Sequence, residues 1–163
     1  MAKYSTVIDT PADIATAFDY LARFSSTKDW DPGVSDASMI TPEPVTVGSL
    51  FQVVASLAGR NVPLTYAVTS FDRPNSVTVR AENNSVISED TITFEVVQTQ
   101  DKTASGHLTT KSVTRVTYHA ELSLKGAFVI FSPFLNLLLN HIGTKAAGGL
   151  QSALLELAGN PQP

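Results

Sequence analysis

Hydrophobic and polar residues alternate through much of the middle of the chain, and a helical pattern replaces this alternation near the C-terminus. At 62–68 every second residue is apolar, which predicts a half-buried strand, and the same pattern recurs at 92–96 and most clearly at 115–124. From 133 to 157 apolar residues recur at steps of three and four, which predicts one long helix with an apolar face. The members of that face are Leu135, Leu138, Leu139, Ile142, Ala146, Leu150, Ala153 and Leu157.

Local signals near the N-terminus predict a strand followed by two short helices. Residues 3–9 are rich in aromatic and β-branched residues, which favours a first strand. Thr10-Pro11-Ala12-Asp13 is typical of a helix start, because it combines a capping hydroxyl, a proline in the first turn and an acidic side chain. A second short helix is expected at 24–30, where Asp31-Pro32-Gly33 ends it.

The remaining segments extend the predicted sheet to about seven strands. We expect further strands at 35–40, 47–57 and 77–82, joined to their neighbours mainly by hairpins. The polar stretch 98–112 is expected to be a long mobile hairpin loop. Strands in series followed by one long helix predict an α+β fold, in which helices cover one face of a curved antiparallel sheet.

Composition limits the partners that we expect. The net charge is −4 and there is no cluster of Lys or Arg, which argues against binding to nucleic acid. No apolar run reaches about 18 residues and the N-terminus lacks a signal-peptide core, so we expect a cytoplasmic protein without membrane insertion. The chain has no cysteine, which excludes thiol catalysis and disulfides. Its 163 residues predict a single domain over 1–158 with a short flexible tail at 159–163, as a monomer or weak dimer.

Several short motifs occur in an order that is more informative than any of them alone. They are Thr10-Pro11-Ala12-Asp13, Trp30-Asp31-Pro32-Gly33-Val34, Gly48-Ser49-Leu50-Phe51, the run from Arg115-Val116-Thr117-Tyr118 to Leu124-Lys125-Gly126, and Gly148-Gly149-Leu150 with Leu154 and Leu157. In this order the chain resembles the START-like, Bet v 1-like superfamily (SRPBCC), and within it the bacterial proteins of polyketide cyclase/dehydrase type. The resemblance spans nearly the whole chain and implies a helix-grip fold with a deep cavity between sheet and last helix. It does not specify a function, because relatives include lipid carriers, hormone receptors, aromatase/cyclases, quinone-binding proteins and chaperone activators.

The strand register directs few polar side chains towards such a cavity. Tyr66, Asn83, Asp90 and Tyr118 are the candidates, with Trp30 near the rim. Tyrosine hydroxyls and an amide in an apolar pocket would orient a carbonyl or hydroxyl of a ligand. Alternatively, both tyrosines are core aromatics whose polar tips reach backbone or solvent. The complete set of expected ligand-binding residues is Trp30, Phe51, Tyr66, Asn83, Phe94, Tyr118, Leu139, Gly143 and Ala147.

Asp90 is the only carboxylate that the register places inward, and it is a weak catalytic candidate together with Tyr118. Burial would raise its pKa and suit it to proton transfer. The alternative is a solvated carboxylate at a strand start beside Glu89. No second carboxylate pairs with Asp90 by spacing, so a two-carboxylate mechanism is not expected.

The histidines and the helix glycines are easier to interpret as structural residues. His107, His119 and His141 are expected at the surface and have no metal-ligand spacing, so neither a metal nor another cofactor is expected. Glycine inside a helix costs about 1 kcal/mol relative to alanine. Three such residues, Gly143, Gly148 and Gly149, therefore indicate either close packing on the sheet or cleared volume above a ligand.

Three functions remain open from the sequence. The leading hypothesis is binding, and possibly transport, of a small hydrophobic molecule such as a polyketide, isoprenoid or lipid. The alternative is an enzyme of the polyketide cyclase/aromatase or dehydratase type that uses the same cavity. A module that binds a protein partner through the outer face of the sheet is the third. The shortage of paired inward ionisable groups favours binding over catalysis.

Overall fold

The computed structural model describes residues 1–57 and 59–159. The side chains of residues 57, 128, 131, 132 and 134–139 are not part of this description. Among the residues it does cover, no helix has the length and hydrophobicity needed to cross a bilayer.

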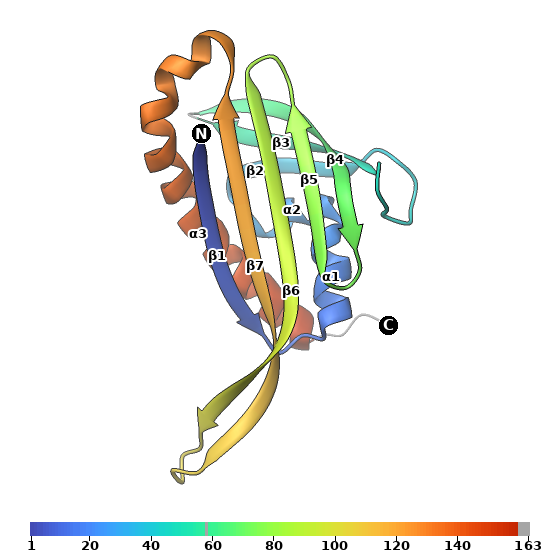
Figure 1. The fold of residues 1–163 in the computed structure, drawn as a ribbon, viewed down its shortest axis with the longest axis vertical. Helices are drawn as coiled ribbons and strands as arrows, with labels where there is room; N and C mark the ends of the chain where they lie inside the picture. The colour runs from blue at the N-terminus through green and yellow to red at the C-terminus, as the bar shows by residue number, and fades with distance from the viewer. Residues whose placement is uncertain (58, 160–163) are drawn as a thin grey trace.

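The described strands form one curved antiparallel sheet of seven strands in the order β1-β7-β6-β5-β4-β3-β2 (Figure 1). Strands β2 to β7 each pair with the next in sequence, and β1 closes the other edge beside β7. The strand bounds are β1 (Ala2–Thr10), β2 (Val34–Met39), β3 (Leu50–Leu57), β4 (Arg60–Asp72), β5 (Ser76–Glu82), β6 (Val86–Lys102) and β7 (Leu108–Leu124).

The helices lie on one side of this sheet (Figure 1). Their bounds are α1 (Ile14–Ala22), η1 (Phe24–Ser26), α2 (Thr27–Trp30), η2 (Gly126–Phe131) and α3 (Ser132–Gly159). The expected helix follows this motif, but it begins at Ile14 and its cap is Asp13 rather than Thr10: the Asp13 side chain accepts a hydrogen bond from the backbone N–H of Ala15 at 3.1 Å. Helix α3 packs along β1, and the Thr10 hydroxyl donates to the Leu154 carbonyl at 3.1 Å. This arrangement confirms the predicted α+β helix-grip fold.

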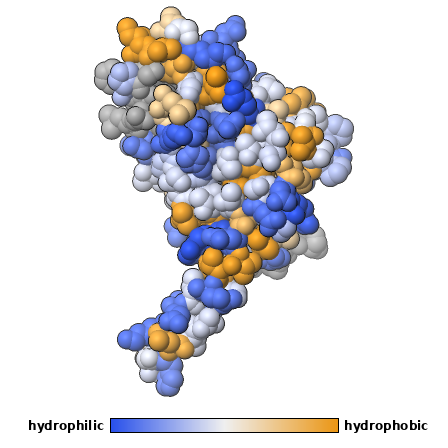
Figure 2. All heavy atoms as spheres, viewed as in Figure 1, coloured by the Kyte–Doolittle hydropathy of each residue, from blue (hydrophilic) through white to orange (hydrophobic). Residues whose placement is uncertain are grey.

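The segment 98–112 is not the mobile loop that the sequence predicted. Strands β6 and β7 stay paired as far as Lys102 and Leu108, so only a short turn remains between them. The paired strands project from the body as an arm, whose surface is mainly hydrophilic (Figures 1 and 2). Because both faces of the arm are exposed, its residues show no apolar alternation, although their backbones form a regular ladder.

The two ends of the sheet are packed differently. Beneath α1 the space is filled by aromatic rings, with the Phe18 centroid 5.2 Å from those of Phe71 and Phe94. Beneath α2 and α3 the packing is incomplete and a cavity remains. The fold therefore has one solid end and one hollow end.

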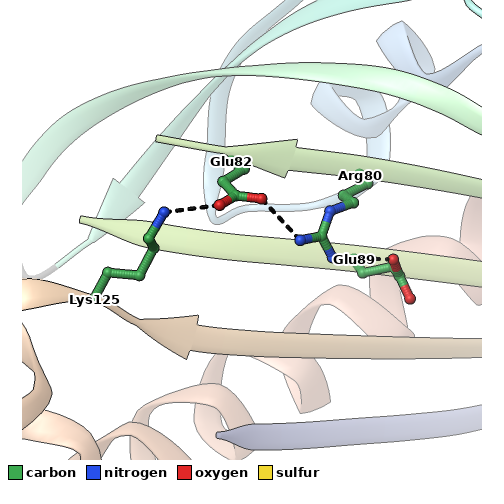
Figure 3. Close-up of polar contacts among 4 residues, drawn as sticks. All are labelled: Arg80, Glu82, Glu89 and Lys125. Atoms are coloured by element: carbon green, nitrogen blue, oxygen red, sulfur yellow. Dashed lines mark hydrogen bonds and ion pairs between the residues drawn. The ribbon is translucent and has the colours of Figure 1, made fainter. Parts of the chain in front are cut away.

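The outer face of the sheet carries charges. Figure 3 shows ion pairs among four of its residues, Arg80, Glu82, Glu89 and Lys125. These side chains are more than a third exposed, so solvent screens the pairs and they add little to stability. Their orientation has a consequence for the opposite face: because Glu89 points outward, its neighbours Ser88 and Asp90 point towards the helices.

Candidate ligand-binding pocket

A cavity of about 140 Å³ lies between α3 and the sheet. Its helix side includes Trp30 at the end of α2 and Ile142, Ala146 and Leu150 on α3. Strands β1, β2, β3, β4, β6 and β7 contribute residues to the other wall. The volume is close to that of an engineered cavity of about 150 Å³ that binds benzene. The space therefore accommodates a group of about the size of one aromatic ring.

Polar side chains from three strands meet at one part of this wall. Ser88 and Asp90 come from β6, Tyr66 from β4 and Tyr118 from β7. The Tyr66 hydroxyl donates to Ser88 Oγ at 2.9 Å. The Tyr118 ring packs edge-on against Trp30, with centroids 5.7 Å apart. The cavity thus combines apolar walls with a small polar area, as ligand pockets generally do.

Asp90 is the most strongly perturbed carboxyl of this area. Asp90 as a whole residue is 6% exposed to solvent. Burial raises the pKa of Asp90 to about 7, and the nearby charge of Asp31 acts in the same direction. The hydroxyls of Tyr118 and Tyr66 oppose the rise, because they stabilise the ionised form. Near neutral pH this carboxyl can therefore both give and accept a proton.

Asp31 is a second carboxylate in the same cavity, and the sequence analysis missed it. Its side chain accepts a hydrogen bond from the backbone N–H of Gly33 at 2.7 Å, which holds the turn after α2. Burial raises the pKa of Asp31 as well. The expectation that no second carboxylate accompanies Asp90 is therefore wrong. The sequence shows an acidic residue directly after Trp30, but the alternation of residues along a strand does not predict where the side chain of a turn residue points.

The two tyrosines act as hydrogen-bond donors rather than as bases. Burial raises the pKa of Tyr66 well above its ordinary value, and it does the same for Tyr118. The charge of Asp90 adds to both shifts. Both hydroxyls consequently keep their protons at neutral pH, so each can donate to a ligand oxygen or to a carboxylate.

The cavity walls include six of the residues expected from the sequence. They are Trp30, Tyr66, Asp90, Tyr118, Gly143 and Ala147. Two of the expected aromatics lie elsewhere. Phe51 is fully buried with its ring centroid 6.5 Å from that of Phe24, and Phe94 packs on Phe18 under α1. Their inward orientation was predicted correctly, but they fill the core instead of lining the cavity.

A third expected residue, Asn83, does not line the described cavity. The prediction that Asn83 faces inward is wrong, because it lies exposed in the turn between β5 and β6. Its side-chain oxygen accepts hydrogen bonds from the backbone N–H groups of Ser85 at 2.8 Å and Val86 at 2.9 Å. An asparagine in this role stabilises the turn. The side chain of Leu139 falls outside the described residues.

The helix glycines separate into two kinds. A Cβ atom at Gly143 would lie 2.6 Å from the ring of Tyr4 on β1. One at Gly149 would overlap the backbone carbonyl oxygen of Trp30. Gly148, between them, has nothing within 4 Å of such an atom. Close packing, one of the two alternatives from the sequence, therefore explains Gly143 and Gly149, which bring α3 against β1 and α2.

The histidines lie away from the cavity. His107 and His141 are exposed, and His119 is on the outer face with its Nε2 atom 3.1 Å from Glu121 Oε1. Within the described residues, no three His, Asp or Glu side chains are grouped closely enough to hold a metal ion.

The family model described as "Polyketide cyclase / dehydrase and lipid transport" matches residues 1–158. The chain belongs to this family. A search of curated protein sequences finds no match to the chain.

Solved structures share the fold of this polyketide cyclase/dehydrase family member. A START superfamily protein from Mycobacterium smegmatis is 11% identical over 96% of this chain and 99% of its own, with a TM-score of 0.70. A conserved protein from Geobacillus kaustophilus is 11% identical over 95% of each chain, with a TM-score of 0.64. The protein XoxI from Bacillus cereus is 16% identical over 96% of this chain and 98% of its own, with a TM-score of 0.59. At these identities the similarity establishes the START-like fold but does not identify a ligand.

Proposed function

We propose that the protein binds a small hydrophobic molecule in the cavity between α3 and the sheet. The observation that carries the proposal is a ring-sized space with mainly apolar walls on which a few polar groups converge. The family description, which includes lipid transport, agrees with this role.

The cavity volume favours a compact ligand. A long acyl chain or a molecule of several fused rings is much larger than the benzene that a cavity of similar volume holds. Such a ligand would bind only if α3 moved away from the sheet. We therefore propose that the part of the ligand held between α3 and the sheet is about one ring in size.

Trp30 provides a direct measurement of binding, because it lines the cavity and is the single tryptophan of the chain. We expect benzyl alcohol to change the Trp30 fluorescence in a saturable way. The variant Ala146→Leu should bind about tenfold more weakly or not at all, because Ala146 is nearly buried at the cavity wall and a larger side chain occupies the space.

The matched control is Gln151→Leu, which adds a leucine to the exposed side of the same helix and should bind like the wild type. Thermal unfolding of both variants separates loss of binding from loss of folding. Equal affinity of Ala146→Leu and wild type, or no fluorescence response in any of the three proteins, would contradict the proposal.

A proton-transfer enzyme of the cyclase, aromatase or dehydratase type is the second candidate function. The observation that favours it is the Asp90 carboxyl, whose pKa of about 7 lets it act as either a proton donor or a proton acceptor near neutral pH. The same pocket also contains Asp31 and two tyrosine hydroxyls. In a dehydration, one carboxylate would remove a proton next to a ketone while a neutral carboxyl protonated the departing hydroxyl, giving an enone and water.

A β-hydroxyketone of suitable size, 4-hydroxy-4-phenylbutan-2-one, tests this candidate, because loss of water gives a conjugated ketone that absorbs in the ultraviolet. If the protein is such an enzyme, Asp90→Asn and Tyr118→Phe should each lower the rate, the first by about 100-fold. No turnover by the wild type, or unchanged rates in both variants, would leave binding as the function.

A further inference from the structure

The charges that line the cavity have one sign. Asp31, Asp90 and Glu121 contribute to its walls, whereas no Lys, Arg or His is found among its described lining residues. Glu121 also borders the cavity, but its carboxylate lies on the outer face of the sheet, where it pairs with Lys3 and His119. For Asp31 and Asp90, no ion pair occurs within the described part of the chain. Two carboxylates in the cavity therefore have no cationic partner there.

Asp90 is the informative member of this pair. It is 6% exposed and lines the cavity, where its polar neighbours are the hydroxyls of Tyr118 and Tyr66, and no Lys, Arg or His is among the described lining residues. Buried carboxylates are normally paired with a cation, because an unpaired buried charge is costly. At the surface, Asp9 is paired with Arg115 and Asp19 with Arg73. Asp90 has no such cation within the described part of the chain, and a cationic group of a ligand would supply one.

The aromatic lining is compatible with a positively charged ligand. Trp30 and Tyr118 meet edge-on at the cavity wall that also includes the carboxylates, and Tyr66 on β4 belongs to the same lining. The negative face of an aromatic ring attracts a cation. An ammonium group there would combine ionic hydrogen bonds to carboxylates with contacts to rings, while its apolar body packs on α3.

We infer that the ligand bears a protonated amine on a compact apolar body, and that Asp90 and Asp31 bind this amine. The inference rests on the proposed function and narrows it to one chemical class. It disfavours fatty acids and other carboxylates, because their negative charge would be buried beside two acidic side chains. A neutral molecule of the same shape would bind without the charge-assisted hydrogen bonds.

Three probes of similar size separate these possibilities: benzylamine, benzyl alcohol and benzoate. At about pH 8 benzylamine is protonated and Asp90 is mainly ionised. Titration followed by Trp30 fluorescence should show benzylamine binding about tenfold more tightly than benzyl alcohol, with benzoate the weakest of the three. The ratio of the benzylamine and benzyl alcohol affinities is the quantity to compare between variants.

Asp90→Asn should bring this ratio close to one, and Asp31→Asn should reduce it. The matched control is Glu89→Gln, the same chemical change on the opposite face of β6, which should leave the ratio unchanged. Benzyl alcohol or benzoate binding as tightly as benzylamine would overturn the inference and leave the binding pocket intact. A ratio that stayed the same in both aspartate variants would overturn it too. If none of the three probes changed the Trp30 signal, the proposed function would fail together with the inference.

Discussion

Asp90→Asn is expected to make the protein more stable above pH 7, although it changes a buried polar side chain of the cavity. The folded state raises the pKa of Asp90 from 3.8 to about 7, mainly by burial. Between these two values the folded protein keeps a proton that the unfolded chain has lost, so the free energy of unfolding falls as the pH rises. Above pH 7 the decrease is complete, and below pH 4 it is absent.

The size of the effect follows from the shift. Each pKa unit corresponds to about 1.4 kcal/mol, so the raised pKa of Asp90 costs at most about 4 kcal/mol of stability at alkaline pH. Asparagine carries no charge at any of these pH values and avoids the cost. Urea unfolding between pH 4 and pH 9 should therefore show a decline for the wild type that is much smaller for Asp90→Asn.

Glu89→Gln is the control for this experiment, because Glu89 adjoins Asp90 in sequence but lies on the outer face beside Arg80. It should keep the decline of the wild type. If the wild type showed no loss of stability between pH 4 and pH 7, or if Asp90→Asn were the less stable protein at pH 8, the carboxyl would not be desolvated in the way that the cavity requires.

The second large effect is expected at two adjacent glycines of α3. Gly149→Ala should destabilise the protein by about 3 kcal/mol, because the added Cβ overlaps the carbonyl oxygen of Trp30, and a backbone atom cannot rotate away. Gly148→Ala should instead stabilise it by about 1 kcal/mol, since that position is open and alanine is the better helix former. Thermal or urea unfolding of the two variants measures both effects.

The two variants also report on the cavity, because Gly149 allows α3 to approach Trp30, which forms part of the cavity wall. We expect Gly149→Ala to alter the Trp30 fluorescence and Gly148→Ala to leave it unchanged. Similar stability changes in the two variants would mean that α3 does not lie against the end of α2.

The architecture could be predicted from the sequence because the spacing of apolar residues follows the buried faces of the helices and strands. Steps of three and four from 133 to 157 correspond to α3, and the alternation at 115–124 corresponds to the part of β7 that faces the helices. The arm formed by β6 and β7 was missed for the same reason. Neither of its faces is buried, so its backbone pairing left no apolar pattern to detect.

The candidate site was predictable where the periodicity of a strand or of α3 positions the residue, as it does for Gly143 and Ala147. Alternation placed Tyr66, Asp90 and Tyr118 inward, and all three line the cavity. Alternation could not distinguish an inward residue at the hollow end of the sheet from one at the solid end, which is why Phe94 was included. It also said nothing about Asp31, whose position depends on how the turn after α2 meets α3.

The most direct test of the account is a crystal structure of the protein with benzylamine. We predict that the ring lies between α3 and the sheet, near Trp30 and Leu150, with the nitrogen within hydrogen-bond distance of Asp90 or Asp31. A hollow closed by side chains, or benzylamine bound only elsewhere on the molecule, would contradict it.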